Sequence, residues 1–181
     1  MLLASCPLQV APMNYWLMKS EPGECSIDDL AKAARQSVPW IGVRNYQSRN
    51  YMRDQMQVGD GVLFYHSSCP EPGIAGLAVV ASSAYPDQTQ FDKTNEYFDS
   101  KSTRAAPRWV HVDVKLVRKT PLLGLHRMRD EATLATMLVL RRGNRHEHVA
   151  IHPARLLRGN QSRRIETLHL TRDPHRELTR V

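Results

Sequence analysis

The most regular alternation of apolar and polar positions runs from Trp109 to Leu116. The apolar positions are Val110, Val112, Val114 and Leu116. The polar or charged positions between them are His111, Asp113 and Lys115. Successive side chains of a strand point to opposite faces of a sheet, so this pattern predicts a β-strand with one buried face.

Three shorter apolar runs predict further strands. Tyr15 to Ser20 ends at the turn signal Glu21-Pro-Gly23, and Val62 to His66 is rich in apolar and aromatic residues. Residues 74–81 are nearly all apolar or small, which favours a central strand covered on both faces. The turn at Pro70-Glu-Pro-Gly73 predicts that the last two strands form an antiparallel hairpin.

Two segments carry signals for the start of a helix. Ser26-Ile-Asp-Asp29 has the pattern of a capping box and predicts a helix that begins there. Asn45 is a candidate N-cap for a second helix, expected from Tyr46 to Met56.

The polar stretch at residues 82–107 is long enough for a functional loop. Beyond the alternating strand, two short helices are expected at residues 122–128 and 131–137, the second capped by Asp130. Short strands with interleaved helices and one long loop predict an α+β fold built on a small curved sheet or partial barrel.

The chain has 181 residues and a formal net charge of +7. The length suits one domain, and the charge favours a polyanionic partner, although a basic protein that is merely soluble would show it too. Three scattered cysteines, Cys6, Cys25 and Cys69, predict reduced thiols without a zinc site. No stretch approaches the roughly 20 apolar residues of a membrane span, so no membrane partner is expected. No cofactor is expected either.

Residues 1–13 lack a basic segment and contain prolines, so we expect a disordered leader rather than a signal peptide, with Met13 as an alternative start. Residues 146–181 form an atypical basic tail. Its histidines, His146, His148 and His152, are not accompanied by organised carboxylates or cysteines, and no metal site is expected there.

Residues that could bind a ligand are concentrated in residues 39–50 and in the strand that follows. Rings, amides and guanidinium groups occur there together: Trp40, Tyr46 and Tyr65, Asn45 and Asn50, and Arg44 and Arg49. Rings stack on a heterocycle, amides hydrogen-bond its edge, and guanidinium groups hold an anion. This mixture predicts a nucleobase ligand.

Ordered motifs occur along residues 14–145. They include Tyr15-Trp-Leu-Met-Lys-Ser-Glu-Pro22, Trp40-x-Gly-Val-Arg-Asn-Tyr-Gln-x-Arg-Asn50, Gly73-Ile-x-Gly-Leu77, Tyr97-Phe-Asp-x-Lys-Ser102 and Leu140-Arg-Arg-Gly143. Together these motifs resemble the EVE domain family, and the resemblance implies a domain that covers residues 14–145. The resemblance implies a PUA-like fold, a small curved β-barrel flanked by short helices, related to the YTH domains that read methylated adenine in RNA. It also implies non-catalytic binding of modified bases, chiefly modified cytosine in DNA, with modified RNA as an alternative.

The chain departs from the family pattern after Arg145. Family members usually continue with a strand of the type Leu-Ser-Val-x-Pro-Val and a closing helix, whereas this chain has His146-Glu-His-Val-Ala-Ile-His-Pro153. Our hypothesis is a shifted reading frame or an alternative ending. It predicts a barrel that lacks its last strand and has an open edge.

Two groups of site residues are predicted from these patterns and from the resemblance. The base-binding pocket is assigned to Lys19, Ser20, Trp40, Val43, Asn45, Tyr46, Tyr65, His66, Ser67, Tyr85, Pro86 and Asp87. Contacts to phosphate are assigned to Arg44, Arg49, Lys101, Arg104, Arg108, Arg141 and Arg142. The pocket would lie between the first strand, the loop of Trp40 and the end of the Tyr65 strand, with residues 85–87 as a lid or second wall.

Several site residues have a simpler alternative. Trp40 could pack in the core, and His66 could be buried with its hydrogen bonds satisfied. Asn45 could be a helix cap alone, and Arg44 and Arg49 could be solvated surface cations.

A small hydrolase or base-processing enzyme is the alternative function. It would use Lys19 or His66 with Asp87, but no nucleophile and base have the spacing of a catalytic motif. We expect a monomeric nucleic-acid-binding protein, cytoplasmic in a bacterium and nuclear in a eukaryote.

Overall fold

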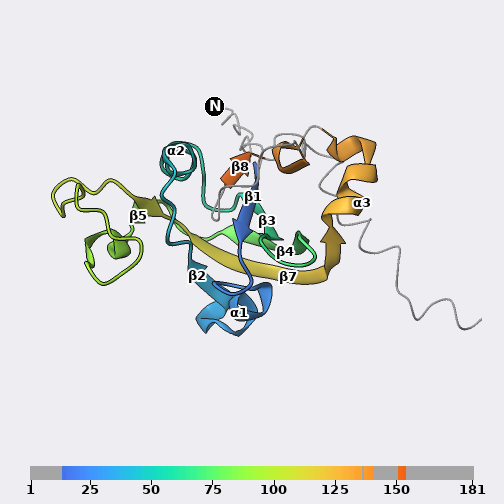
Figure 1. The fold of residues 1–181 in the computed structure, drawn as a ribbon, viewed down its shortest axis with the longest axis horizontal. Helices are drawn as coiled ribbons and strands as arrows, with labels where there is room; N and C mark the ends of the chain where they lie inside the picture. The colour runs from blue at the N-terminus through green and yellow to red at the C-terminus, as the bar shows by residue number, and fades with distance from the viewer. Residues whose placement is uncertain (1–13, 136, 141–150, 154–181) are drawn as a thin grey trace, which may run out of the picture.

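The computed structural model describes residues 14–135, 137–140 and 151–153. Its main sheet has six strands in the order β2-β7-β4-β3-β1-β8 and curls into a half-barrel (Figure 1). These strands are β1 (Tyr15–Ser20), β2 (Ser37–Pro39), β3 (Gly61–His66), β4 (Gly73–Val80), β7 (Asp113–Gly124) and β8 (Ile151–Pro153). β1 and β3 are parallel, and the other neighbours are antiparallel. The predicted α+β fold on a small curved sheet is confirmed.

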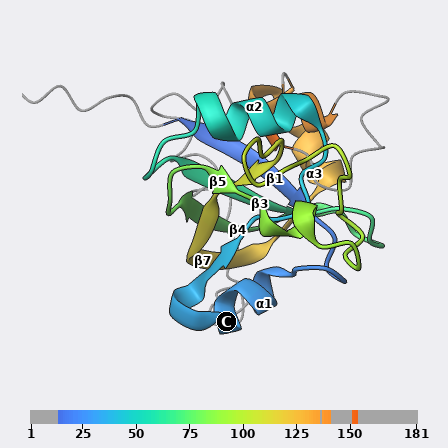
Figure 2. The same ribbon diagram turned by 90° about the vertical axis from the view of Figure 1, so that its left-hand side faces the viewer.

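Short helices flank this sheet, with α2 and α1 on opposite sides of it in Figure 2. α1 (Ile27–Lys32) begins at Ser26, which forms the predicted capping box with Asp29. α2 (Tyr46–Asp54) begins after Asn45, whose side-chain oxygen accepts a hydrogen bond from the Ser48 N–H at 2.9 Å. The other helical segments are η1 (Ala34–Gln36), η2 (Gln88–Phe91), α3 (Leu125–Asp130), η3 (Ala132–Leu134) and η4 (Leu138–Leu140).

Apolar side chains cover both faces of the sheet because its strands alternate between two core clusters. The first cluster includes Trp16, Met18, Trp40, Val62, Phe64, Val112 and Val114. The second includes Leu17, Leu63, Tyr65, Ile74, Leu123 and Met128. β4 contributes to both clusters and pairs with β3 on one side and β7 on the other. The predicted hairpin and its doubly covered central strand are therefore confirmed.

The strand predicted from the alternating segment is interrupted and longer than expected. A two-residue strand, β6 (Val110–His111), pairs with β5 (Tyr85–Pro86) in a separate ribbon, and β7 continues to Gly124. The predicted helix at residues 122–128 is wrong in its first turn, because Leu123 pairs with Ile74 and Gly124 with Gly73.

The C-terminal region differs from expectation in two ways. The helix predicted at residues 131–137 is reduced to the 3-10 turn η3, and the residue at its start is Glu131, which makes no side-chain cap. β8 pairs antiparallel with β1 at the edge where a missing last strand was expected. Among the described residues, the tail thus supplies a strand to this edge.

Candidate nucleic-acid interface

Trp40 lies at the end of β2 with its indole in the first core cluster. Only 5% of the residue is exposed, and its ring meets Phe64 edge-on, with centroids 5.4 Å apart and planes at 85°. The indole Nε1 is buried and has no hydrogen-bond partner among the described residues. The ring does not present an open face for stacking, but it carries an unused N–H donor. Val43, also predicted for the pocket, is buried in the same cluster.

Gly42 fixes the path of the chain after Trp40. Its φ of +80° is in the left-handed region, and a Cβ there would lie 2.7 Å from the ring of Tyr97. Both the backbone conformation and the contact require glycine. Tyr97 belongs to the long loop, and its hydroxyl donates to the Glu24 carboxylate at 3.0 Å. The loop is thereby packed onto the Trp40 segment.

Arg44 and Asp87 form the second connection between these segments. Arg44 Nη1 lies 2.9 Å from Asp87 Oδ2 and 3.1 Å from the Val43 carbonyl, while Nε and Nη2 donate to the Tyr97 carbonyl and the Thr89 hydroxyl. All five guanidinium N–H groups therefore have protein acceptors. Arg44 was predicted to contact phosphate, but these bonds make it a brace within the protein, and we remove it from that set.

Asp87 was predicted as part of a lid, yet it is completely buried. Its carboxylate also accepts from the N–H groups of Gly42 and Thr89. Burial alone would raise the pKa of Asp87, but the hydrogen bonds from Thr89, Arg44 and Gly42 outweigh it and hold that pKa below its ordinary value. Asp87 therefore serves as an ionised anchor and is not available at a surface.

Gln90, which was not among the predicted site residues, organises the rest of the long loop. Its side chain is fully buried and donates to the carbonyls of Asp87 and Trp109 at 2.6 and 2.9 Å. Its Oε1 accepts from the backbone N–H groups of Arg108 and Trp109. A glutamine in a polar stretch looks like a surface residue until the fold buries it.

An exposed aromatic stack lies at the start of α2. We call it the Tyr46 stack: Tyr46, Trp109, Arg49 and Arg108. The rings of Tyr46 and Trp109 are stacked with centroids 4.9 Å apart and planes at 28°, and Tyr46 is 48% exposed. Trp109 was not among the predicted site residues. Its ring supports Tyr46, while its Nε1 donates to Asp99 at 2.7 Å.

The ends of β1 and β3 lie side by side, as predicted. Ser67 N–H donates to the Ser20 carbonyl at 2.9 Å, and the Ser20 hydroxyl donates to the Cys25 carbonyl at 2.8 Å. The Ser67 hydroxyl is buried and has no partner among the described residues. Lys19, in the same strand as Ser20, is also buried.

His66 has the satisfied arrangement that was the alternative to a pocket role. Its Nε2 accepts from the Ile27 N–H at 3.0 Å, and burial lowers the pKa of the imidazole. Its ring lies edge-on to Phe64, 5.8 Å away, on the same face of the sheet as Trp40.

Tyr65 does not share a pocket with Trp40. It belongs to the second core cluster, on the face of β3 opposite Phe64, because neighbouring strand residues point in opposite directions. The residue is buried, and that burial raises the pKa of its hydroxyl to about 12. We therefore remove Tyr65 from the proposed pocket.

Tyr85 and Pro86 form β5 at the surface of the ribbon. The Tyr85 hydroxyl donates to Asp113 at 2.6 Å, and its ring packs edge-on against His111 at 4.0 Å. His111 was expected on the polar face of a strand, but it is buried where β6 pairs with β5, and both ring nitrogens have no hydrogen-bond partner among the described residues. Its Nδ1 lies 3.9 Å from Asp87 Oδ1. Burial lowers the pKa of His111, which favours the neutral imidazole.

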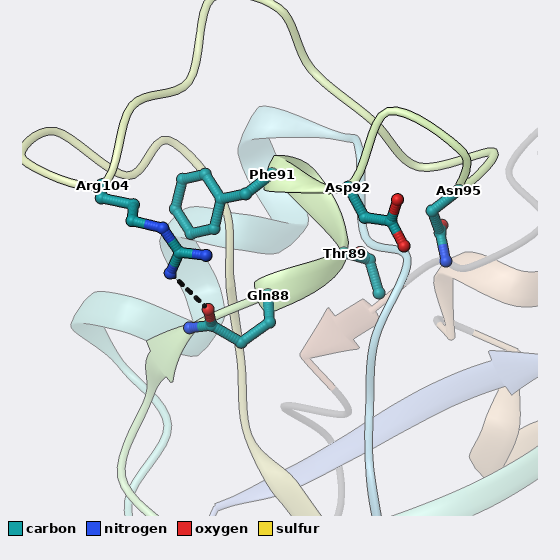
Figure 3. A pocket seen from close by; sticks show the side chains of 6 residues that line it. All are labelled: Gln88, Thr89, Phe91, Asp92, Asn95 and Arg104. Carbon is teal, nitrogen blue, oxygen red and sulfur yellow. Dashed lines mark hydrogen bonds between the residues drawn. The ribbon is translucent and has the colours of Figure 1, made fainter.

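The remaining predicted phosphate contacts lie on the long loop or outside the described residues. Lys101 and Arg104 are exposed, and Arg104 lies over the ring of Phe91 at 5.1 Å and donates to Gln88 at 3.3 Å. Figure 3 shows Arg104, Phe91 and Gln88 beside an open pocket of about 370 Å³, which Thr89, Asp92 and Asn95 also line. Lys101 is not among the lining residues. Arg141, Arg142, His146 and His148 lie outside the described residues.

The described ranges hold neither a metal-binding cluster nor a membrane-spanning helix. No group of three histidine, cysteine or acidic side chains there is placed to hold a metal ion. None of the helices in those ranges is long and apolar enough to cross a membrane.

Comparison with known proteins decides the family. The model of the EVE domain matches residues 14–157, which extends past residue 145, where we expected the domain to end. This chain belongs to the EVE domain family. Human thymocyte nuclear protein 1 is 47% identical over 114 residues, which cover 58% of this chain and 50% of that protein. The chain thus spans about half the length of these curated relatives.

Solved structures of EVE relatives have the same fold. A hypothetical protein from Leishmania major is 44% identical with a TM-score of 0.76, over 87% of this chain and 94% of that chain. Human THYN1 in complex with DNA containing 5-methylcytosine is 35% identical with a TM-score of 0.77, over 88% of this chain and 99% of that chain. The PUA-like fold implied by the sequence motifs is confirmed.

Proposed function

We propose that this EVE domain binds DNA that carries a modified cytosine and catalyses no reaction on it. The observation that carries the proposal is the likeness to human THYN1, which has been solved in complex with 5-methylcytosine-containing DNA. The likeness spans 88% of this chain and 99% of that chain. The net charge of +7 supports a polyanionic partner.

The base would enter where Trp40 meets the ends of β1 and β3. The rings of Trp40, Phe64 and His66 follow one another on one face of the sheet, and Ser20 and Ser67 end the adjoining strands. Two donors in this region, Trp40 Nε1–H and the Ser67 hydroxyl, are buried without partners among the described residues. A buried donor without a partner costs about 1–3 kcal/mol, and a base with a carbonyl oxygen and ring nitrogens would supply acceptors.

A binding role is also supported by what the candidate catalytic groups do. His66 Nε2 already accepts from Ile27, and Asp87 is held by Arg44 beneath the surface. The pairing of His66 with Asp87 that an enzyme would need is therefore not assembled.

The name of the thymocyte nuclear proteins supports a nuclear location for eukaryotic members of the family. The location of this chain stays a prediction.

The test compares binding of two oligonucleotides that differ only in one cytosine methyl group, by fluorescence anisotropy. We expect tighter binding of the methylated strand, by up to about 100-fold, because a methyl-sized difference is worth roughly 1–3 kcal/mol. Trp40→Phe keeps a ring of the core and removes the N–H donor, so it should weaken both complexes while the thermal midpoint stays close to wild type. Equal affinity of the wild type for both strands, or conversion of the base detected by mass spectrometry, would contradict the proposal.

A further inference from the structure

The Tyr46 stack has a geometry that the modified-base pocket does not require. Trp109 supports one face of Tyr46 at 4.9 Å, and Gln90 and Asp99 hold Trp109 through its backbone N–H and its indole N–H. Arg108 donates to the Tyr46 hydroxyl. Trp109 thus holds one face of the exposed Tyr46 side chain, and Arg108 holds its hydroxyl. This restraint reduces the side-chain entropy that Tyr46 would lose when a ligand binds.

Two cations lie close to the Tyr46 ring, which nevertheless remains exposed. The Arg49 guanidinium carbon is 4.7 Å from the Tyr46 centroid and 5.9 Å from the Trp109 centroid, and the Arg108 guanidinium carbon is 5.7 Å from the Tyr46 centroid. Because the Tyr46 and Trp109 centroids are 4.9 Å apart, Arg49 does not lie on the line that continues from Trp109 through Tyr46. The face of Tyr46 opposite Trp109 is its outer face, and the residue is 48% exposed.

Two arginines therefore border one flat aromatic surface. Arg49 donates to Asn50 Oδ1 through Nε and Nη2 and to the Arg108 carbonyl through Nη1. Among the described residues these bonds leave one N–H on each of its terminal nitrogens. Arg108 is paired with Asp99 at 3.3 Å and remains partly exposed. A flat ring with cations at its edge matches a base flanked by its phosphates.

We propose that the outer face of Tyr46 stacks an unpaired base that neighbours the modified one, with Arg49 and Arg108 near the adjoining phosphates. The inference rests on the proposed function only in that the ligand is a nucleic acid. Stacking uses the π-face that every base has, so this contact is independent of sequence and of modification. A base inside a duplex has both faces covered, so the contact favours strands that are single or locally open.

The experiment measures four ligands by fluorescence anisotropy: a single strand and a duplex, each with cytosine or 5-methylcytosine. The variants are Tyr46→Leu and Tyr46→Phe, with Phe98→Leu as control, because Phe98 is another exposed aromatic residue and lies outside the stack. Tyr46→Leu should weaken binding of both single strands by about 5- to 100-fold and by the same factor. The preference for the methylated base should remain, and Tyr46→Phe should retain most of the affinity.

The outcomes separate the two proposals. A Tyr46→Leu variant that binds single strands as well as the Phe98→Leu variant would overturn the stacking role of Tyr46, whatever the methyl preference. Loss of methyl preference with unchanged affinity for unmodified strands would place Tyr46 in the modified-base pocket instead and would also overturn it. If the wild type shows no methyl preference but Tyr46→Leu still weakens both strands equally, the proposed function fails and the stack stands. Thermal melting of each variant confirms that it is folded.

Discussion

The guanidinium of Arg44 lies 2.9 Å from the carboxylate of Asp87, which has no exposed surface. The two residues are 43 positions apart and belong to the segment that follows Trp40 and to the start of the long loop. The ion pair is accompanied by hydrogen bonds to Thr89, Tyr97 and Gly42, so the loop and the Trp40 segment form one unit. The proposed interface with DNA would depend on this unit because Trp109 and Arg108 lie at the loop's far end.

Asp87→Asn should destabilise the domain strongly. The substitution removes the negative charge and leaves the Arg44 guanidinium, which is 22% exposed, without its counter-ion. Removing one partner of a buried ion pair costs about 3–5 kcal/mol. Urea unfolding followed by tryptophan fluorescence measures the change. Asp54→Asn is the matched control, because Asp54 pairs with Arg53 at the surface, where both side chains are 49% exposed. A similar small effect of both substitutions would show that the Arg44–Asp87 pair does not hold the loop.

The same pair should make stability sensitive to acid. The pKa of Asp87 in the folded state is below its ordinary value of 3.8, so the unfolded chain binds a proton more readily. The stabilisation is complete above pH 3.8 and is lost as the pH falls through the lower folded value. Unfolding free energies measured between pH 2 and 5 should therefore fall more steeply for wild type than for Asp87→Asn. Parallel curves for the two proteins would contradict the assigned pKa direction.

Gly42→Ala should loosen the long loop. Alanine at a φ of +80° costs about 1–2 kcal/mol, and its Cβ would also press on the Tyr97 ring. Faster amide exchange in residues 88–108, together with a lower thermal midpoint, is the expected result. Gly23→Ala serves as the control, since a Cβ at Gly23 meets nothing within 4 Å. Wild-type exchange in the Gly42→Ala loop would mean that Tyr97 does not depend on this close approach.

Gln90→Leu should disorder the support of the Tyr46 stack. Leucine has a similar size but leaves the buried N–H of Trp109 without an acceptor, at a cost of about 1–3 kcal/mol for each such group. The stability should fall, and the near-ultraviolet circular dichroism of the stacked rings should weaken. Gln88→Leu changes an exposed glutamine of the same helical turn and should leave both signals unchanged. Retention of the aromatic signal in Gln90→Leu would show that Trp109 is held by other contacts.

Local patterns were sufficient to predict much of this fold. The capping box at Ser26, the cap at Asn45 and the apolar run of β4 each depend on residues close together in the chain, and each was found where expected. Leu123 and Gly124 were misjudged as helical. Their conformation is set by pairing with β4, some 50 positions away, and not by the residues around them.

The site was harder to predict than the fold, because residue type does not specify burial. Arg44 and Asp87 are of residue types that usually lie at a surface, but the fold pairs them with each other. Tyr65 differs from Phe64 by one position and therefore faces the other core cluster. The support that Trp109 gives Tyr46 joins residues 63 positions apart, and no pattern within either segment indicates it.

The three tryptophans allow the central claim to be tested in one titration, because each indole N–H has a different environment. Trp16 Nε1 donates to Asp60 at 2.8 Å, Trp109 Nε1 donates to Asp99 at 2.7 Å, and Trp40 Nε1 has no partner among the described residues. The measurement is the position of the three indole signals in ¹⁵N–¹H spectra as 5-methylcytosine DNA is added, with the unmodified strand as reference. We expect the Trp40 signal to move downfield with the methylated strand as its N–H gains an acceptor, while the Trp16 signal stays in place. A Trp40 signal that does not move while binding saturates would contradict the assignment of this indole to the base pocket.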